Sequence, residues 1–321
     1  MVDLQTIVLP KPKKGVLDRT SSKWFEAITF AICLYIPEGV TEIGDSAFEG
    51  FINLVSVKLP KTLTKIGDRA FCGCERLTGI SFPESLTEIG GFAFKGCKEL
   101  ITISLPKGLT EIRECTFADC YKLTELVLPD SIIKIGWSAF IDCSGLTEIR
   151  LPKGITQIDN CIFCYCKGLT KIILHEGINR IGDNAFNGCY GLKSIELPET
   201  LVEIGDSAFK DCIKLSSINL PGGITEIADA TFMHCQNLNE IKLHEGVTKI
   251  GDMAFYGCGK AVSITLPGTL TEIGWKAFAP DYTGFKSLET ISAPETIHHL
   301  LEKQKFPSKL SLQQMLENGS N

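Results

Sequence analysis

The sequence contains no hydrophobic run long enough to cross a membrane. A transmembrane helix needs about 18 or more consecutive apolar residues, and the best candidate, Ala27 to Ile36, is too short and is interrupted by Thr29. The N-terminal stretch MVDLQTIVLPKPKK also lacks the charged, apolar and small-residue regions of a signal peptide. From the residues alone we expect no membrane insertion and, by default, a cytoplasmic location.

Clustered positive charge is also scarce. The 321 residues include 32 Lys and Arg against 38 Asp and Glu, which gives a formal net charge of −6 at pH 7. Lys11, Lys13 and Lys14 form the only local basic run, and we interpret it as a solvated loop. Because nucleic-acid binding draws its affinity from clustered Lys and Arg, we expect no nucleic-acid partner.

The motifs of common catalytic sites are missing. The sequence has no Gly-rich phosphate loop, no H-E-x-x-H and no G-x-S-x-G. The recurring GDSAF carries Asp and Ser without a partnering His, and the adjacent His298 and His299 are interpreted as part of a solvated face. We therefore predict that the protein is not an enzyme and that it holds no cofactor and no metal.

What the sequence does contain is a repeat of 23 residues. The pattern of the segment VTEIGDSAFEGFINLVSVKLPKT recurs in eleven consecutive copies, and only the last copy contains an insertion. When the copies are aligned, one position is Ile and another is Phe in all eleven. Large apolar side chains at fixed offsets predict a stacked interior, where each contributes on the order of 1.5 to 3 kcal/mol of transfer free energy. The copies begin at Val40, Leu63, Leu86, Leu109, Ile132, Ile155, Ile178, Leu201, Ile224, Val247 and Leu270.

Each copy predicts one coil of a solenoid. LVSVKLP (54–60) alternates apolar and polar residues, which is the period of a strand with one buried face. GDSAFEGF (44–51) has the spacing of a short helical turn, with Asp45 as its N-cap. Stacked coils of this kind predict a right-handed solenoid with a parallel sheet along one side.

The repeat also predicts the domain boundaries. Residues 1–39 are expected to form an N-terminal cap that includes a degenerate repeat, with Phe25 in the Phe column and Thr20 in the Ile column. Residues 40–296 hold the eleven repeats, with a four-residue insertion in the last one. Residues 297–321 show helical spacing and are expected to form a C-terminal helical cap.

The coil LTEIGDRAFCGCERLTGISFPES, with its I-G-x-x-A-F-x-G-C core and trailing L-x-x-I-x-x-P, resembles the BspA-type (Treponema-type) leucine-rich repeat. The resemblance covers Val40 to about Thr296. It implies a leucine-rich-repeat solenoid and a protein-binding module of the adhesin or host-interacting kind. It also implies a surface or secreted location if an export signal has been removed.

Nine of the fourteen cysteines fall in one column, three residues after the Phe. Phe51 holds the same place in the first coil, so we predict a buried ladder of free thiols. Parallel stacking sets neighbouring Cβ atoms wider apart than a disulfide prefers. Cys72 and Cys164 follow the Phe directly, in a column that we expect to face solvent. The ladder comprises Cys74, Cys97, Cys120, Cys143, Cys166, Cys189, Cys212, Cys235 and Cys258.

Three coils depart from the pattern together, in IRECTF, IDNCIF and IADATF. Each loses the Gly after Ile, and each has Thr or Ile in place of Ala. We hypothesise that this Gly has a positive φ, that these coils take a different turn, and that Cys161 there replaces the buried Ala. A zinc site at Cys161, Cys164 and Cys166 is the alternative, but a fourth ligand is missing.

The exposed columns suggest where a partner binds. The strand face carries charges of both signs among Thr and Ser, and exposed aromatics gather on the opposite, helical-turn side of coils three to seven. Trp137 there replaces the capping Asp, and aromatics are favoured interface anchors. We expect a monomeric protein-binding module, the alternative being a structural or self-associating scaffold. The candidate residues are Phe92, Tyr121, Trp137, Tyr165, Tyr190, Glu125, Glu148, Arg150 and Lys171.

Overall fold

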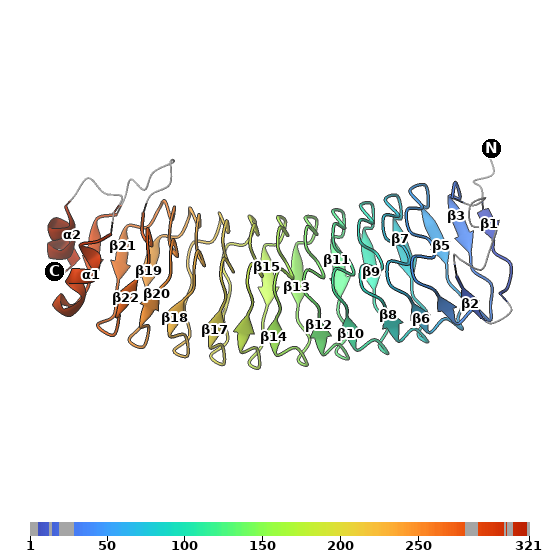
Figure 1. Cartoon of the computed structure of the whole chain (residues 1–321), viewed down its shortest axis with the longest axis horizontal. Coiled ribbons are helices and arrows are strands. Elements are labelled where there is room, and N and C mark those ends of the chain that lie inside the picture. The colour runs from blue at the N-terminus through green and yellow to red at the C-terminus, as the bar shows by residue number, and fades with distance from the viewer. Residues whose placement is uncertain are drawn as a thin grey trace. The chain divides into compact units, whose positions relative to one another are not determined.

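A computed structural model describes residues 6–12, 15–18, 29–279, 288–304, 306 and 311–319. The chain divides into two compact units, Met1–Ile155 (unit 1) and Thr156–Asn321 (unit 2). Both units consist of 23-residue coils with short parallel strands (Figure 1), which confirms the predicted leucine-rich-repeat solenoid. Thr20 and Phe25, assigned above to a degenerate repeat, lie outside the described residues.

Unit 1 has two strands per coil, where the repeat predicted one. The odd-numbered strands β1 to β11, each three residues long, form one parallel sheet. A second set of two-residue strands ends at a buried residue, which is Leu17 in β2 and an Ile in the other coils. The first set comprises β1 (Thr6–Val8), β3 (Cys33–Tyr35), β5 (Ser56–Lys58), β7 (Gly79–Ser81), β9 (Thr102–Ser104) and β11 (Glu125–Val127). The three-residue strand β13 (Glu148–Arg150) follows in the next coil and lies outside that sheet. The second set comprises β2 (Val16–Leu17), β4 (Glu42–Ile43), β6 (Lys65–Ile66), β8 (Glu88–Ile89), β10 (Glu111–Ile112) and β12 (Lys134–Ile135).

Unit 2 repeats this plan and ends in short helices. Met315 of α2 is buried, and α2 packs against β23. The three-residue strands are β15 (Lys171–Ile173), β19 (Glu240–Lys242), β21 (Ser263–Thr265) and β23 (Thr290–Ser292). The two-residue strands are β14 (Gln157–Ile158), β16 (Arg180–Ile181), β17 (Glu203–Ile204), β18 (Glu226–Ile227), β20 (Lys249–Ile250) and β22 (Glu272–Ile273). The helices are η3 (Glu295–Ile297, 3₁₀), α1 (His298–Leu301) and α2 (Leu312–Gly319).

The core of each unit is a stack of phenylalanine rings. In unit 1 the ring centroids of Phe48 and Phe71 are 5.2 Å apart, and those of Phe117 and Phe140 are 5.8 Å apart. In unit 2 the stack runs from Phe163 to Phe278, and its members are buried. These separations lie in the favourable range for offset aromatic pairs, so the Phe column supplies a continuous apolar contact between coils within each unit.

The segment expected to be a helical turn is a series of turns instead. The residue two places before each Phe has a positive φ, as at Ser46 (52°) and Arg69 (56°), and a left-handed residue interrupts an α-helical turn. Asp45 is therefore not a helix N-cap. Its Oδ1 accepts a hydrogen bond of 2.8 Å from the backbone N–H of Asp68 in the following coil, so this column links neighbouring coils.

The Gly after Ile has a different role from the one expected, because none of these glycines has a positive φ. A Cβ on Gly136 would lie 2.6 Å from the backbone N of Glu114 in the preceding coil, which is closer than real Cβ atoms approach. The close approach of two backbones, and not a turn conformation, therefore favours glycine at this position, although Arg113, Asp159 and Ala228 occupy it in the three variant coils.

The hypothesis of a different turn in the three variant coils is wrong. Cys115 (φ 49°), Cys161 (58°) and Ala230 (52°) occupy the left-handed position as its equivalents do in other coils. Thr116 and Ile162 are buried in the Ala column itself. Cys161 is accordingly half-buried and does not take the place of the alanine.

The cysteine ladder is buried as predicted. Its thiols donate to the carbonyl of a Phe in the preceding coil, as Cys74 Sγ does to Phe48 O at 3.2 Å and Cys189 Sγ to Phe163 O at 3.2 Å. The solvent-facing assignment of Cys164 is wrong, since its side chain is 4% exposed. The residue directly after the Phe is partly covered by the surrounding coil. Small residues at this position, such as Cys164 and Ala118, are therefore buried, whereas the longer Lys95 is only half-buried.

Candidate functional site

The predicted charged residues of the strand face do not all lie together. Glu148 and Arg150 of β13 line a groove in unit 1, whereas Glu125 of β11 is exposed outside it. Lys171 lies on β15 of unit 2 and is also exposed. The structure therefore places two of the four charged candidates at one site.

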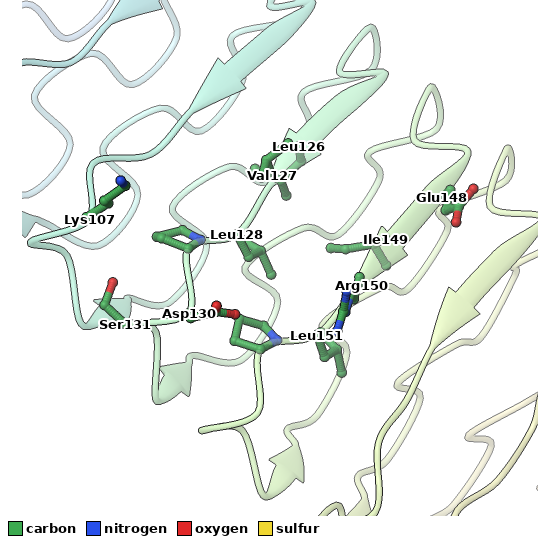
Figure 2. Close-up of a pocket in the computed structure, with 12 residues that line it drawn as sticks. Lys107, Leu126, Val127, Leu128, Asp130, Ser131, Glu148, Ile149, Arg150 and Leu151 are labelled. Carbon is green, nitrogen blue, oxygen red and sulfur yellow. The ribbon is translucent and has the colours of Figure 1, made fainter.

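The groove lies between the coils of β11 and β13 and has a volume of about 680 Å³. Figure 2 shows Leu128 and Ile149 pointing into the space between the two coils. Both side chains are buried, so they form the floor. Its complete lining is Lys107, Leu126, Val127, Leu128, Pro129, Asp130, Ser131, Glu148, Ile149, Arg150, Leu151 and Pro152.

An interruption of the sheet accounts for the groove. The six-stranded sheet of unit 1 ends at β11, and β13 of the following coil does not belong to that sheet. Val127, at the end of β11, is 71% exposed, although the same column holds polar Lys58, Ser81 and Ser104 in earlier coils. The edge of the sheet therefore presents an apolar side chain directly to solvent.

The charges around the groove have both signs. Lys107 and Asp130 lie on one side, and Glu148 and Arg150 come from β13 (Figure 2). A mixed rim around an apolar floor is the usual composition of a surface that binds another protein. It lacks the cluster of one sign that a strongly charged ligand would need.

Two of the predicted aromatics form a second surface in unit 1. The rings of Phe92 and Trp137 meet edge to face with centroids 6.2 Å apart, and Trp137 is 52% exposed. The Arg69 guanidinium lies 5.0 Å and the Lys95 ammonium 5.8 Å from the centroid of the Phe92 ring. These cation–π contacts hold Phe92 in place and leave Trp137 as the accessible ring.

The other predicted aromatics lie elsewhere on the coils. Tyr121 is 42% exposed, and burial raises the pKa of its hydroxyl, with smaller contributions from Asp119 and Asp142. In unit 2, a Cβ on Gly188 would lie 2.9 Å from Cε1 of the Tyr165 ring, and the Lys167 ammonium lies 5.9 Å from the centroid of Tyr190. Tyr165 and Tyr190 thus belong to unit 2, whereas the Phe92 and Trp137 pair belongs to unit 1.

Sequence reasoning missed several exposed apolar residues, among them Val127 and Trp275. Val127 carried only a weak signal, because its column in unit 1 holds the apolar Val8 and the aromatic Tyr35 as well as polar residues. Trp275 of unit 2 occupies the same column as Trp137, is 58% exposed, and has the Lys276 ammonium 4.2 Å from its ring centroid. Its replacement of the usual Asp was visible in the repeat alignment.

Titratable groups with shifted pKa values serve the scaffold. A hydrogen bond to Glu111 raises the pKa of Arg113, whose guanidinium also lies 3.0 Å from Glu88. A hydrogen bond to Glu42 likewise raises the pKa of Lys65. Among the described residues no three His, Cys, Asp or Glu side chains are grouped so as to hold a metal, and no helix has the length and hydropathy to span a membrane.

The chain is similar to known leucine-rich-repeat proteins. The model of the BspA type leucine-rich repeat region matches residues 41–170, 157–283 and 203–315. A leucine-rich repeat protein from Bacteroides ovatus is 24% identical with a TM-score of 0.66, and the match covers 97% of this chain and 93% of that one. No curated protein sequence matches significantly.

Two further solved structures share the fold. A leucine-rich cell surface protein from Faecalibacterium prausnitzii is 27% identical with a TM-score of 0.60, over 95% of this chain and 91% of that one. The pneumococcal vaccine antigen PcpA is 22% identical with a TM-score of 0.59, over 87% of this chain and 78% of that one. Repeat solenoids of this kind offer extended binding surfaces.

Proposed function

Because the chain belongs to the BspA-type leucine-rich repeat family, whose fold serves protein interaction, we propose that it is a non-enzymatic protein-binding module. The groove between the coils of β11 and β13 receives an extended segment of a partner protein. Aliphatic side chains of the segment cover Val127, and its polar groups meet Glu148 and Arg150 at the rim.

The observation that carries this proposal is the exposure of Val127 above a buried apolar floor. Covering a fully exposed Val contributes roughly 1.5 to 3 kcal/mol, which corresponds to about one to two orders of magnitude in affinity. The groove also runs between two neighbouring coils and carries charges of both signs on its rim. Both features favour a polypeptide ligand over a compact small molecule.

An adhesin or host-interacting role is the finer form of the proposal. The F. prausnitzii protein described as a cell surface protein has the same fold over 95% of this chain at 27% identity, which supports a partner encountered at a cell surface. The partner segment is expected to carry an aliphatic side chain flanked by charged residues, because the groove has that complementary character.

The test begins with a displayed library of random linear peptides selected on the wild-type protein. Selected peptides are expected to bind Val127→Asp at least about tenfold more weakly by fluorescence anisotropy. The matched control is Asn219→Asp, which adds the same charge at the exposed, equivalent position of a unit 2 coil. Equal affinity for wild type and Val127→Asp would contradict the proposal.

Self-association is distinguished in the same experiment. Sedimentation velocity is expected to give a monomer for wild type and for Val127→Asp. A wild-type oligomer that Val127→Asp dissociates would show that the groove binds a second copy of this chain, and would favour the scaffold alternative.

A further inference from the structure

We call the four residues that precede each three-residue strand, or the equivalent position of a coil without one, the strand-entry turn. Lysines occur in these turns in both units. In unit 1 they are neutralised by the preceding coil. Lys98 Nζ lies 2.7 Å from Glu75 Oε1, and Lys122 Nζ lies 2.6 Å from Glu99 Oε2. The strand-entry turns of unit 1 therefore present little net charge.

Unit 2 differs, because its first five strand-entry turns contain lysines and no acidic residue; the sixth, which precedes β23, contains Glu289. These first five turns cover residues 167–170, 190–193, 213–216, 236–239 and 259–262. They hold the four lysines Lys167, Lys193, Lys214 and Lys260 and no Asp or Glu. Within a chain of net charge −6, this is a local positive surface that the overall composition conceals.

Three of these lysines converge on one hollow of about 450 Å³. It is lined by Lys193, Lys214, Ser216, Asn237, Asn239 and Lys260. In the described part of unit 2, none of the three ammonium groups makes an ion pair with a carboxylate. The hollow thus combines three uncompensated cations with two amides and one hydroxyl.

The spacing of the cations indicates the shape of the ligand. Neighbouring coils stack at the strand separation of about 4.8 Å, so Lys214 and Lys260, two coils apart, are roughly 10 Å apart at their backbones. Lys193 lies one coil before Lys214. A ligand that contacts all three carries several anionic groups along an extended chain.

The remaining lining residues narrow the class of ligand. The Asn amides and the Ser hydroxyl can donate to and accept from sugar hydroxyl groups. The lining includes no aromatic ring, whereas proteins that bind single-stranded nucleic acids commonly stack bases on aromatic side chains. We propose that this hollow in unit 2 binds a sulfated carbohydrate through Lys193, Lys214 and Lys260. The site is separate in residues and chemistry from the peptide groove.

The test measures binding of a heparin-derived oligosaccharide to the full chain by isothermal titration calorimetry. The variant Lys193→Gln/Lys214→Gln/Lys260→Gln is expected to bind at least about tenfold more weakly, with a shallower salt dependence because fewer ions are released. The matched control, Lys98→Gln/Lys122→Gln/Lys153→Gln, changes the net charge equally in unit 1 and is expected to keep wild-type affinity. Thermal unfolding confirms that both variants are folded.

Two further arms separate sulfate from other anions. The fully desulfated oligosaccharide is expected not to bind, and a single-stranded oligonucleotide of matched charge is expected to bind more weakly. Equal loss of affinity in the two lysine variants would overturn the site. Tighter binding of the oligonucleotide would overturn the assignment to sulfated carbohydrate.

Discussion

The buried cysteine ladder is expected to make the protein unstable at alkaline pH. Burial raises the pKa of Cys74 to about 12 and raises that of the deeper Cys97 and Cys212 well above the ordinary value of 9.0. In the folded protein these thiols therefore stay neutral at a pH where the unfolded chain ionises. The same direction holds for Cys120, Cys143, Cys189 and Cys235.

The sign of the effect follows from proton linkage. A pKa raised in the folded state gives a stabilisation that is complete below the unfolded pKa of 9.0 and is lost as pH rises above it. At about pH 10 each thiol has lost roughly 1.4 kcal/mol. Seven such thiols together lose on the order of 10 kcal/mol, which is comparable with the whole stability of a typical domain.

The assay is urea unfolding under reducing conditions at about pH 8 and about pH 10. The loss of unfolding free energy between these values is expected to be about 1.4 kcal/mol smaller for Cys212→Ala than for wild type. Ile227→Val, which trims a buried side chain of unit 2 without removing a titrating group, is expected to lose as much as wild type. Equal pH dependence in all three proteins would refute the argument.

Three further predictions concern packing and thiol access. Phe209→Ala is expected to cost about 3 to 5 kcal/mol in urea unfolding, because it removes a ring from the buried stack; a cost below about 1 kcal/mol would contradict the role of the stack. Gly136→Ala is expected to lower the melting temperature, since its Cβ would meet the backbone N of Glu114, and an unchanged melting temperature would show that coils separate freely. In native protein a thiol reagent is expected to modify only the half-buried Cys33, Cys72 and Cys161, as peptide mapping can check; rapid labelling of a ladder cysteine would contradict its burial.

The fold was predictable because its determinants recur. Ile and Phe at fixed offsets every 23 residues require a stacked core, and the alternation in 54–60 requires a strand with one buried face. The left-handed residue was not predictable, since its column holds residues as different as Ser46, Phe92 and Met253. The packing of the coil imposes that conformation, and no residue type in the column signals it.

The candidate site was predictable only in part. Glu148 and Arg150 were expected on the strand face because alternation places them there, and they line the groove. The groove itself depends on where the sheet ends after β11, and a column pattern that is continuous along the chain does not reveal such an interruption. Cys161 and Cys164 were assigned in reverse because their burial depends on how far neighbouring coils cover each column.

Hydrogen–deuterium exchange of the protein bound to a selected peptide tests the peptide groove most directly. We expect slower exchange over residues 126–131 and 148–152, which line the groove. Exchange is expected to stay unchanged in the turn that carries Phe92 and in the strand-entry turns of unit 2. Protection confined to the Phe92 turn, or absent from both groove segments, would contradict the claim that the groove binds the partner.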